Sequence, residues 1–387
     1  MLAYNKQSLD NLLIQQRSDT VLQRNLLTKE EYDAIAAAHP INLYTPNIFI
    51  RIGLFLATAV SAIMGFGILM LMFNFGTELN VIFPFFSVLV YVVLEWTADK
   101  IKHFHSGVDD ALLWLSVGFI IATVNYYVPD LSGLAESVLI FILSAFAVVR
   151  FSGWLMSVVM LLSIFAMIFY SIVPLGAFAK MILPFVLMVA SLAIYVIVKK
   201  NKTAASLRHY TSSLLAIEVV SLIGIYVSVN YFVVRELSNA LFNLRLAPGA
   251  SISGGWFFWT ATLLIPPTYI FLGLRKKDIV LLRVGLLLLA ATIFTFRYYY
   301  SAAPIEVVMT IGGAVVMVLM YIVTRYLKTP RHGITSQQND DPELAALRQV
   351  EGLVIAETYH PTAAPAQSDA FQFGGGSSGG AGATGEY

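Results

Sequence analysis

The stretch "KHFHSGVDD", residues 102–110, carries side chains of the types that bind divalent metal ions. His103 and His105 are two positions apart, so they would not share one face of a helix, and Asp109 and Asp110 follow in the same connection. A metal-ligand cluster is one interpretation of this pattern. We interpret it instead as a solvated polar loop, and we predict no metal site.

Motifs of known enzyme classes give no further candidates. The patterns HExxH and GxSxG and a phosphate-binding loop do not occur in the sequence. There is no cysteine, which excludes disulfide and thiolate chemistry, and the formal net charge of +1 gives no reason to expect nucleic-acid binding. The sequence therefore predicts no catalytic residue and no cofactor.

Ionisable residues inside apolar segments are the stronger candidates for a functional site. An ionised side chain at the middle of a bilayer costs at least about 2.5–3.5 kcal/mol, so it usually has a partner or reaches water. One interpretation is structural ion pairs or snorkelling side chains, and the other is an ion or substrate path. We predict that Glu218 faces the interior and pairs with Arg283, and that Glu136 pairs with Lys180. The full set of candidates is Glu95, Glu136, Lys180, Glu218, Arg283 and Glu306.

A short fragment recurs where apolar segments end, in "FNFGTELN", "VNYYVPDLS" and "VNYFVVRELS". Each copy has an asparagine, then an aromatic residue, then an acidic residue followed by leucine; the asparagines are Asn74, Asn125 and Asn230. Asparagine often ends helices and aromatic residues favour the membrane interface, which explains the pattern without a repeat. The alternative is an internal repeat, with spans three to six and seven to ten as two units.

The elements that carry these residues are predicted from composition. Hydrophobic residues make up 58% of the 387 residues and charged residues 12%, about half the charged fraction of a soluble domain. The mean hydropathy is +0.76. The apolar runs are continuous rather than alternating, which favours helices over a barrel. The predicted fold is an all-α, polytopic integral membrane bundle in contact with the lipid bilayer.

We predict about ten spans, each near the roughly 20 residues needed to cross a bilayer. They are Ile48–Phe73, Val81–Trp96, Ala111–Val128, Leu134–Val149, Gly153–Val173, Ala177–Val198, Ser212–Val234, Gly255–Leu272, Ile279–Phe296 and Ile305–Tyr326.

The distribution of Lys and Arg predicts the orientation of the spans. The odd-numbered connections hold Arg235, Arg245 and Arg297, and most other basic residues between spans lie in the even-numbered connections. Because basic residues favour the cytoplasmic side, both termini are predicted to be cytoplasmic, in a bacterial inner membrane.

The chain divides into four predicted parts: a cytoplasmic helical segment, 1–47; a transmembrane domain, 48–327; a cytoplasmic linker with one amphipathic helix, 328–370; and a disordered Gly-rich tail, 371–387. In the first part, Thr28 and Glu31 form a capping-box pattern that predicts the start of a helix. The aromatic residues of the tail make it a candidate contact for a cytoplasmic protein partner, and the alternative is a passive tail or an expression linker.

Two parts of the sequence resemble known families. The segment "LLTKEEYDAI", followed by a first span that ends in "FNFGTE", resembles a bacterial family of polytopic membrane proteins of unknown function, the DUF2157 type. That family usually has tryptophan after the asparagine, whereas this chain has Phe75. The ending "FGGGSSGGAGATGEY" is similar to the tails of bacterial membrane proteins with a TPM domain, although no TPM domain is visible here. Neither resemblance implies a catalytic residue.

These observations leave three hypotheses for function. We favour a non-enzymatic scaffold or regulatory component of a membrane complex, because enzymatic motifs are absent and both ends carry helical segments. The alternative is a secondary transporter or channel that uses the intramembrane carboxylates. A membrane enzyme that acts on lipid-linked substrates is a second alternative, and it would require clustered His, Asp or Arg at one membrane face.

Overall fold

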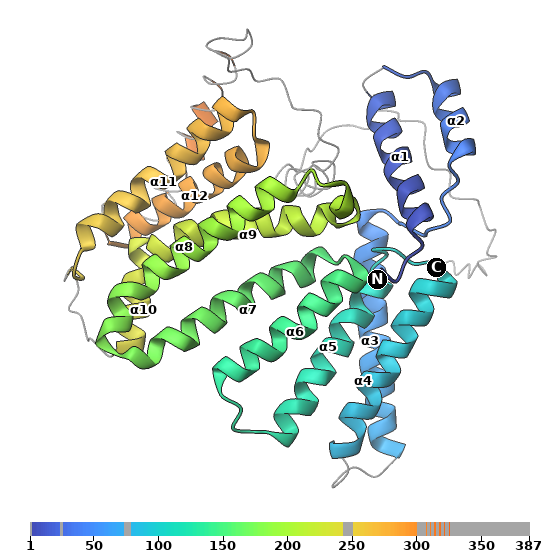
Figure 1. Ribbon diagram of the computed structural model, residues 1–387, viewed down its shortest axis with the longest axis horizontal. Helices are drawn as coiled ribbons and strands as arrows, with labels where there is room; N and C mark the ends of the chain where they lie inside the picture. The colour runs from blue at the N-terminus through green and yellow to red at the C-terminus, as the bar shows by residue number, and fades with distance from the viewer. Residues whose placement is uncertain are drawn as a thin grey trace, which may run out of the picture. The chain divides into compact units, whose positions relative to one another are not determined.

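The computed structural model describes residues 2–23, 26–72, 79–242 and 251–299, and positions 307, 310, 313, 314, 317, 318, 321 and 325. Every regular element in these residues is a helix, so the chain is all-α, as predicted (Figure 1). The first helices are α1 (Lys6–Gln23), α2 (Lys29–Ala38), α3 (Ile48–Met72), α4 (Leu79–Trp96), the π-helix η1 (Thr97–Ile101), α5 (Val108–Tyr127) and α6 (Gly133–Phe151). The others are α7 (Trp154–Ile172), the short 3₁₀ helix η2 (Val173–Leu175), α8 (Ala177–Asn201), the 3₁₀ helix η3 (Ala205–Tyr210), α9 (Thr211–Val229), α10 (Tyr231–Phe242), α11 (Gly255–Lys276) and α12 (Ile279–Tyr299).

Nine helical segments of the described residues are long and apolar enough to cross a membrane. They are α3 to α9, α11 and α12, in the order of the first nine predicted spans. The architecture is therefore that of a multi-pass membrane protein. The tenth predicted span lies almost entirely outside the described residues, and the predicted amphipathic helix and Gly-rich tail lie wholly outside them.

The seventh predicted span, Ser212–Val234, was too long. Helix α9 ends at Val229, and Asn230 has an extended backbone with ψ of 128° before α10 begins at Tyr231. Helix α10 packs against α8, α9 and α11 instead of continuing α9. The hydropathy of the sequence does not fall at this break, so the apolar pattern alone could not locate it.

Helices that are neighbours in the chain pack together as pairs. The most extensive contacts join α4 to α5, α6 to α7, α8 to α9 and α11 to α12, which Figure 1 shows as adjacent ribbons. The α8–α9 pair crosses the boundary between the two predicted four-helix units. The pairing of neighbouring helices does not test the internal repeat, which stays a prediction.

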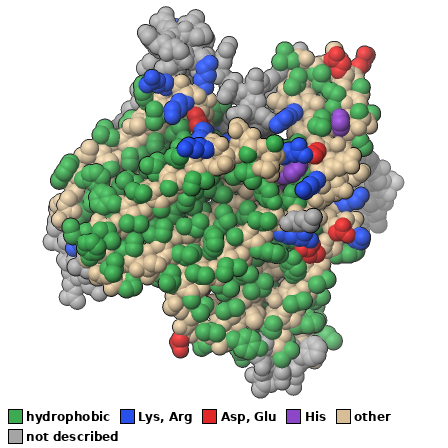
Figure 2. Space-filling view, viewed as in Figure 1, with side chains coloured by type: hydrophobic (Ala, Val, Ile, Leu, Met, Phe, Trp, Pro, Cys, Tyr) green, Lys and Arg blue, Asp and Glu red, His purple; other side chains and the backbone are tan. Residues whose placement is uncertain are grey.

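The surfaces of the spans are strongly apolar. Helix α3 has 25 residues, none of which is buried, and its exposed side chains include Phe49, Leu71 and Met72. Figure 2 shows hydrophobic side chains over most of the visible face, while charged side chains and histidines gather near the upper ends of the helices and around the N-terminal pair. Such a surface is stable only against lipid, which agrees with the predicted contact with a bilayer.

A core at one end of the bundle includes the start of the chain. Tyr4 and Leu9 are buried in the same cluster as Leu94, Phe151 and Met156, which belong to α4, α6 and α7. The Tyr4 ring packs edge-on against Phe104, with 4.9 Å between ring centroids. The N-terminal segment is thus part of the folded domain.

Candidate functional site

Glu218 lies at the centre of an ion network that joins three helices. Its side chain is 0% exposed, and its two carboxylate oxygens meet Lys199 Nζ at 2.9 Å and Lys202 Nζ at 3.3 Å. Lys199 Nζ also contacts Asp278 Oδ2 at 2.7 Å. Glu218 belongs to α9, the lysines to the C-terminal end of α8, and Asp278 directly precedes α12. We call these four residues the Glu218 network.

Local structure explains how this network forms. Lysines at the C-terminal end of α8 are favoured by the helix dipole, and part of Lys199 remains exposed while its ammonium group reaches Glu218. The second oxygen of Asp278, Oδ1, accepts hydrogen bonds from the backbone N–H groups of Val280 and Leu281 and so caps α12. A buried carboxylate between two ammonium groups has partners for both of its oxygens without reaching solvent.

The predicted Glu218–Arg283 pair was wrong, although Glu218 does face the interior. The contacts of Glu218 are with Lys199 and Lys202. The sequence interpretation ended the sixth span at Val198 and counted both lysines as loop residues. Because α8 continues to Asn201, the lysines come within reach of Glu218.

Glu95 forms the second ion pair within the spans. Its carboxylate receives two hydrogen bonds from Arg150, at 2.9 Å from Nε and 2.7 Å from Nη2, and a third at 2.6 Å from Tyr91. This bidentate geometry fixes the end of α4 against the end of α6. The sequence identified Glu95 but assigned Arg150 to a solvated connection.

The predicted Glu136–Lys180 pair was also wrong. The Glu136 carboxylate accepts a long hydrogen bond of 3.4 Å from the side-chain amide of Asn125. Lys180 instead lines an apolar pocket between α7, α8, α9 and α10. Of the remaining candidates, Glu306 and Asn74 lie outside the described residues.

Asn230 joins a buried hydrogen-bond network at the break between α9 and α10. Its amide nitrogen donates to Tyr226 Oη at 2.9 Å and to Thr295 Oγ1 at 3.2 Å, and Tyr226 Oη lies 2.8 Å from Thr292 Oγ1. The backbone N–H of Tyr231 is satisfied by Thr262 Oγ1 at 2.9 Å. These contacts compensate the backbone groups freed where the helix breaks. Asn125 has a different partner, so the recurring asparagines do not share one role.

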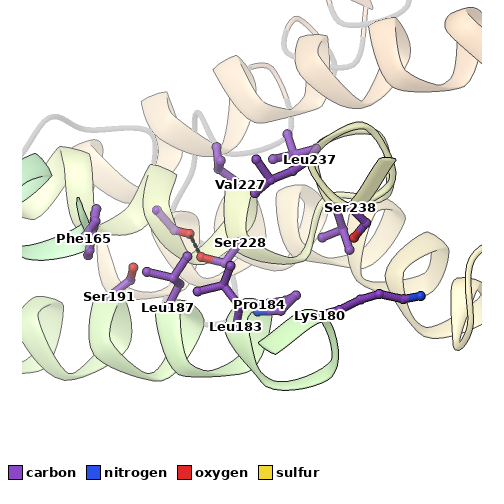
Figure 3. A pocket seen from close by; sticks show the side chains of 13 residues that line it. Phe165, Lys180, Leu183, Pro184, Leu187, Ser191, Val227, Ser228, Leu237 and Ser238 are labelled. Carbon is purple, nitrogen blue, oxygen red and sulfur yellow. Dashed lines mark hydrogen bonds between the residues drawn. The ribbon is translucent and has the colours of Figure 1, made fainter. Parts of the chain in front are cut away.

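The apolar pocket that contains Lys180 has a volume of about 210 Å³. Figure 3 shows Leu183, Pro184 and Leu187 of α8 facing Val227 and Leu237 across it, with Ser191 at one end and Lys180 at the other. Gly224 leaves the space that Ser191 Oγ and Phe165 fill. The polar side chains of the described lining are Lys180 and the serines at 191, 228 and 238.

The "KHFHSGVDD" stretch is not a solvated loop, and that interpretation was wrong. Asp109 is only 4% exposed, and its oxygens accept four hydrogen bonds: from the backbone N–H of His105 at 2.7 Å, from the backbone N–H and hydroxyl of Ser106 at 2.8 and 3.0 Å, and from Tyr4 Oη at 3.1 Å. Burial, and then the nearby Asp109 carboxylate, raise the pKa of Tyr4 well above its ordinary value, so the phenol remains a donor.

Asp110 extends this arrangement to α3. Its Oδ2 receives hydrogen bonds from Arg51 at 2.6 Å and 3.1 Å. Gly107 makes the turn possible: it has a φ of +95°, and a Cβ there would overlap the backbone carbonyl oxygen of Arg51. We call Tyr4, Arg51, His105, Ser106, Asp109 and Asp110 the Asp109 cluster.

The Asp109 cluster contains three residues with metal-ligand chemistry. Ligand-type atoms of His105, Asp109 and Asp110 lie within 4.8 Å of one another. However, both Asp109 oxygens already accept protein donors, and the guanidinium of Arg51 supplies the positive charge beside Asp110. This arrangement favours a structural role, in which the cluster ties the start of the chain and α3 to α5.

No family model matches the chain, and comparisons with curated proteins and with solved structures found no match.

Proposed function

We propose that this chain is a non-enzymatic membrane scaffold, which presents its N-terminal helical pair to a protein partner on the cytoplasmic side of a bacterial inner membrane. The observation that carries the proposal is the way in which α1 is fixed at its base while α2 remains exposed. The resemblance of this segment to the DUF2157 type of membrane protein stays an expectation.

The base of the N-terminal segment contacts the ends of three different spans. The backbone N–H of Ala3 donates to the carbonyl of Arg150 at 2.8 Å, and Tyr4 donates to Asp109. Asp10 of α1 pairs with Arg208 at 2.8 Å and lies 3.4 Å from His209 Nε2. Three independent attachments define the position of α1 far better than a flexible linker could.

The outer part of the pair is rigid and exposed. Asn11 and Gln15 of α1 donate to backbone carbonyls of Pro40 and His39, at 2.9 and 2.6 Å, and so hold the end of α2. No residue of α2 is buried, and its acidic side chains Glu30, Glu31 and Asp33 are exposed. A fixed, acidic helix outside the bundle is suited to a partner with a basic surface.

The transporter hypothesis receives less support from the Glu218 network. A carboxylate that takes part in transport should line a cavity that water or substrate can enter. It should also exchange one ion-pair partner for another during transport. Glu218 is instead fully buried between two lysines and is not part of the lining of the apolar pocket. These features support a structural ion network.

The enzyme hypothesis would rest on the Asp109 cluster, which does gather His, Asp and Arg side chains at one end of the spans. The hydrogen bonds to Asp109 and the Arg51–Asp110 pair occupy the acceptors that a reaction would use. We therefore propose a structural role for this cluster as well.

The orientation is proposed from charge and is supported by contacts. The N-terminal segment contacts Asp109 at the start of α5, Arg150 at the end of α6 and Arg208 in η3. These span ends adjoin the even-numbered, basic connections. Basic connections favour the cytoplasmic side, which would place the N-terminal pair there too. We propose the Gly-rich tail from Phe371 as a second cytoplasmic contact, on the basis of its sequence alone.

Site-specific photo-crosslinking in cells tests the proposal. A photoreactive residue at position 30 or 33 of α2 should give a discrete protein adduct, and the same residue at Asp130, an exposed position beyond the end of α5, should give none. Asp10→Ala removes one of the three attachments of the N-terminal segment and should reduce the α2 adducts at unchanged membrane levels. Absence of adducts at both α2 positions, or equal adducts at position 130, would refute the proposal.

A further inference from the structure

A second cavity lies between the start of the chain and the connection that precedes α9. Its volume is about 460 Å³, and two segments line it that are nearly two hundred positions apart. We call it the basic cleft; its lining residues are Leu2, Lys6, Ala205, Ser206, Arg208, His209 and Tyr210. We propose that the basic cleft binds the phosphate group of an anionic membrane lipid.

The charge of the basic cleft favours an anion. Lys6 is exposed and takes part in none of the ion pairs found among the described residues. Arg208 is 54% exposed; its Nη2 reaches Asp10 and its Nε donates to His209 Nε2, whereas Nη1 makes no hydrogen bond among the described residues. Asp10 is the one carboxylate paired with these groups and does not line the cleft. Lysine and arginine are the side chains that bind phosphate most strongly.

His209 supplies a second, independent observation. Its side chain is only 8% exposed, and Nε2 lies 3.4 Å from Asp10 Oδ1. The other ring nitrogen, Nδ1, is buried without a hydrogen-bond partner in the structure. Buried polar atoms normally have partners, so this nitrogen points to a missing one. A phosphate oxygen is an acceptor that fits the tautomer in which Nδ1 carries the proton, with Nε2 accepting from Arg208 Nε at 3.4 Å.

The position of the cleft favours a lipid over a soluble phosphate compound. Residues 205–210 directly precede α9, so the cleft lies where a span begins and where lipid head groups are found. Tyr210 is anchored by a 2.8 Å hydrogen bond from its hydroxyl to the Val149 carbonyl, and aromatic rings with one polar end favour this depth. Leu2 adds an apolar side chain for the glycerol region.

Such a lipid would join two parts of the chain. Lys6 is the first residue of α1, whereas Arg208 and His209 belong to η3. A phosphate between them would add to the Asp10 contacts that hold the N-terminal segment. The lipid site is inferred from the basic cleft alone and does not depend on the scaffold proposal.

Native mass spectrometry of the full chain in detergent tests the assignment. We expect phosphatidylglycerol to bind more tightly than phosphatidylcholine with the same acyl chains. The double variant Lys6→Gln/Arg208→Gln should weaken phosphatidylglycerol binding by about 30-fold, since each basic side chain contributes roughly fivefold at a membrane surface. Lys200 is an exposed lysine at the C-terminal end of α8. Lys200→Gln is the matched control and should change lipid binding by less than about twofold.

Two further variants separate lipid binding from folding. Asp10→Asn removes the carboxylate that competes for Arg208, and it should leave binding intact or strengthen it even though the α1 contact is lost. If the double variant does not fold, Lys6→Gln alone should still weaken binding about fivefold. Equal binding of both lipids, or equal losses in the Lys6 and Lys200 variants, would overturn the proposal. Displacement of the lipid by millimolar inorganic phosphate would assign the cleft to a soluble phosphate instead.

Discussion

Replacing Glu218 by glutamine tests the Glu218 network most directly. Glutamine keeps the volume of the side chain, so the change removes charge without leaving a cavity. Removing one partner of a buried ion pair typically costs about 3–5 kcal/mol. Lys199 keeps Asp278 at 2.7 Å and is 42% exposed, and Lys202, which is 16% exposed, has an interaction besides its 3.3 Å contact with Glu218. We therefore expect a loss near the lower limit, about 3 kcal/mol in free energy of unfolding.

The assay is equilibrium unfolding in mixed micelles, followed by the fluorescence of the five tryptophans. Glu136→Gln is the matched control, because that carboxylate makes only a long contact with Asn125, and its cost should stay below about 0.5 kcal/mol. Adding Lys202→Met to Glu218→Gln should cost less than the sum of the single changes, by about 1–3 kcal/mol.

A parallel cycle with Arg283→Gln separates the observed network from the pair predicted from sequence. Substitutions at residues that do not contact each other should change the free energy of unfolding additively, within about 0.5 kcal/mol. Coupling of Glu218 to Arg283 but not to Lys202 would refute the argument, as would equal losses for the Glu218 and Glu136 variants.

Three other predictions concern separate features. Gly107→Ala should reduce the free energy of unfolding by about 2 kcal/mol or more, because of its positive φ and the overlap with α3, as measured in the same assay. Hydrogen bonds from Thr28 lower the pKa of Glu31, so the capping box should stabilise α2 above the unfolded pKa of about 4.3 and be lost as pH falls through the folded value. Hydrogen exchange of α2 amides should show this loss, and Thr28→Ala should abolish it. Reporter fusions after Lys202 and after Gly249 should give cytoplasmic and external signals respectively, and equal cytoplasmic signals would contradict the orientation.

Local features of the sequence were the ones that could be predicted. The spans follow from continuous apolar runs, and α2 begins at the Thr28–Glu31 capping box as expected, with both of its reciprocal hydrogen bonds. The burial of Glu218 also follows locally, because it lies well inside an apolar segment. Each of these inferences depends on residues within a few turns of one helix.

The partners of the charged residues could not be predicted in the same way. Lys199 was misplaced because helix ends are uncertain by a few residues in a hydropathy profile, and those few residues decide whether a lysine is in a loop or beside a carboxylate. Asp109 depends on Tyr4, more than a hundred positions away, and no periodicity relates two such residues. The break at Asn230 lies in an apolar stretch without proline, and its local signal is the asparagine itself, a residue that often ends helices. The buried network that compensates the break depends on Thr262, Thr292 and Thr295, which are distant in the chain.

The pairing of helices that are neighbours in the chain has a consequence for the order of folding. Short connections make the closure of each pair inexpensive in chain entropy, so a pair can form soon after its second helix has been synthesised. The contacts of the N-terminal segment are different, because Tyr4 and Asp109 are 105 positions apart and Asp10 and Arg208 are 198 apart. The base of α1 is therefore complete only after the chain has been synthesised as far as Arg208. During that interval its acidic partner α2 is already available to other proteins, so assembly with a partner can begin while the membrane domain is still being inserted.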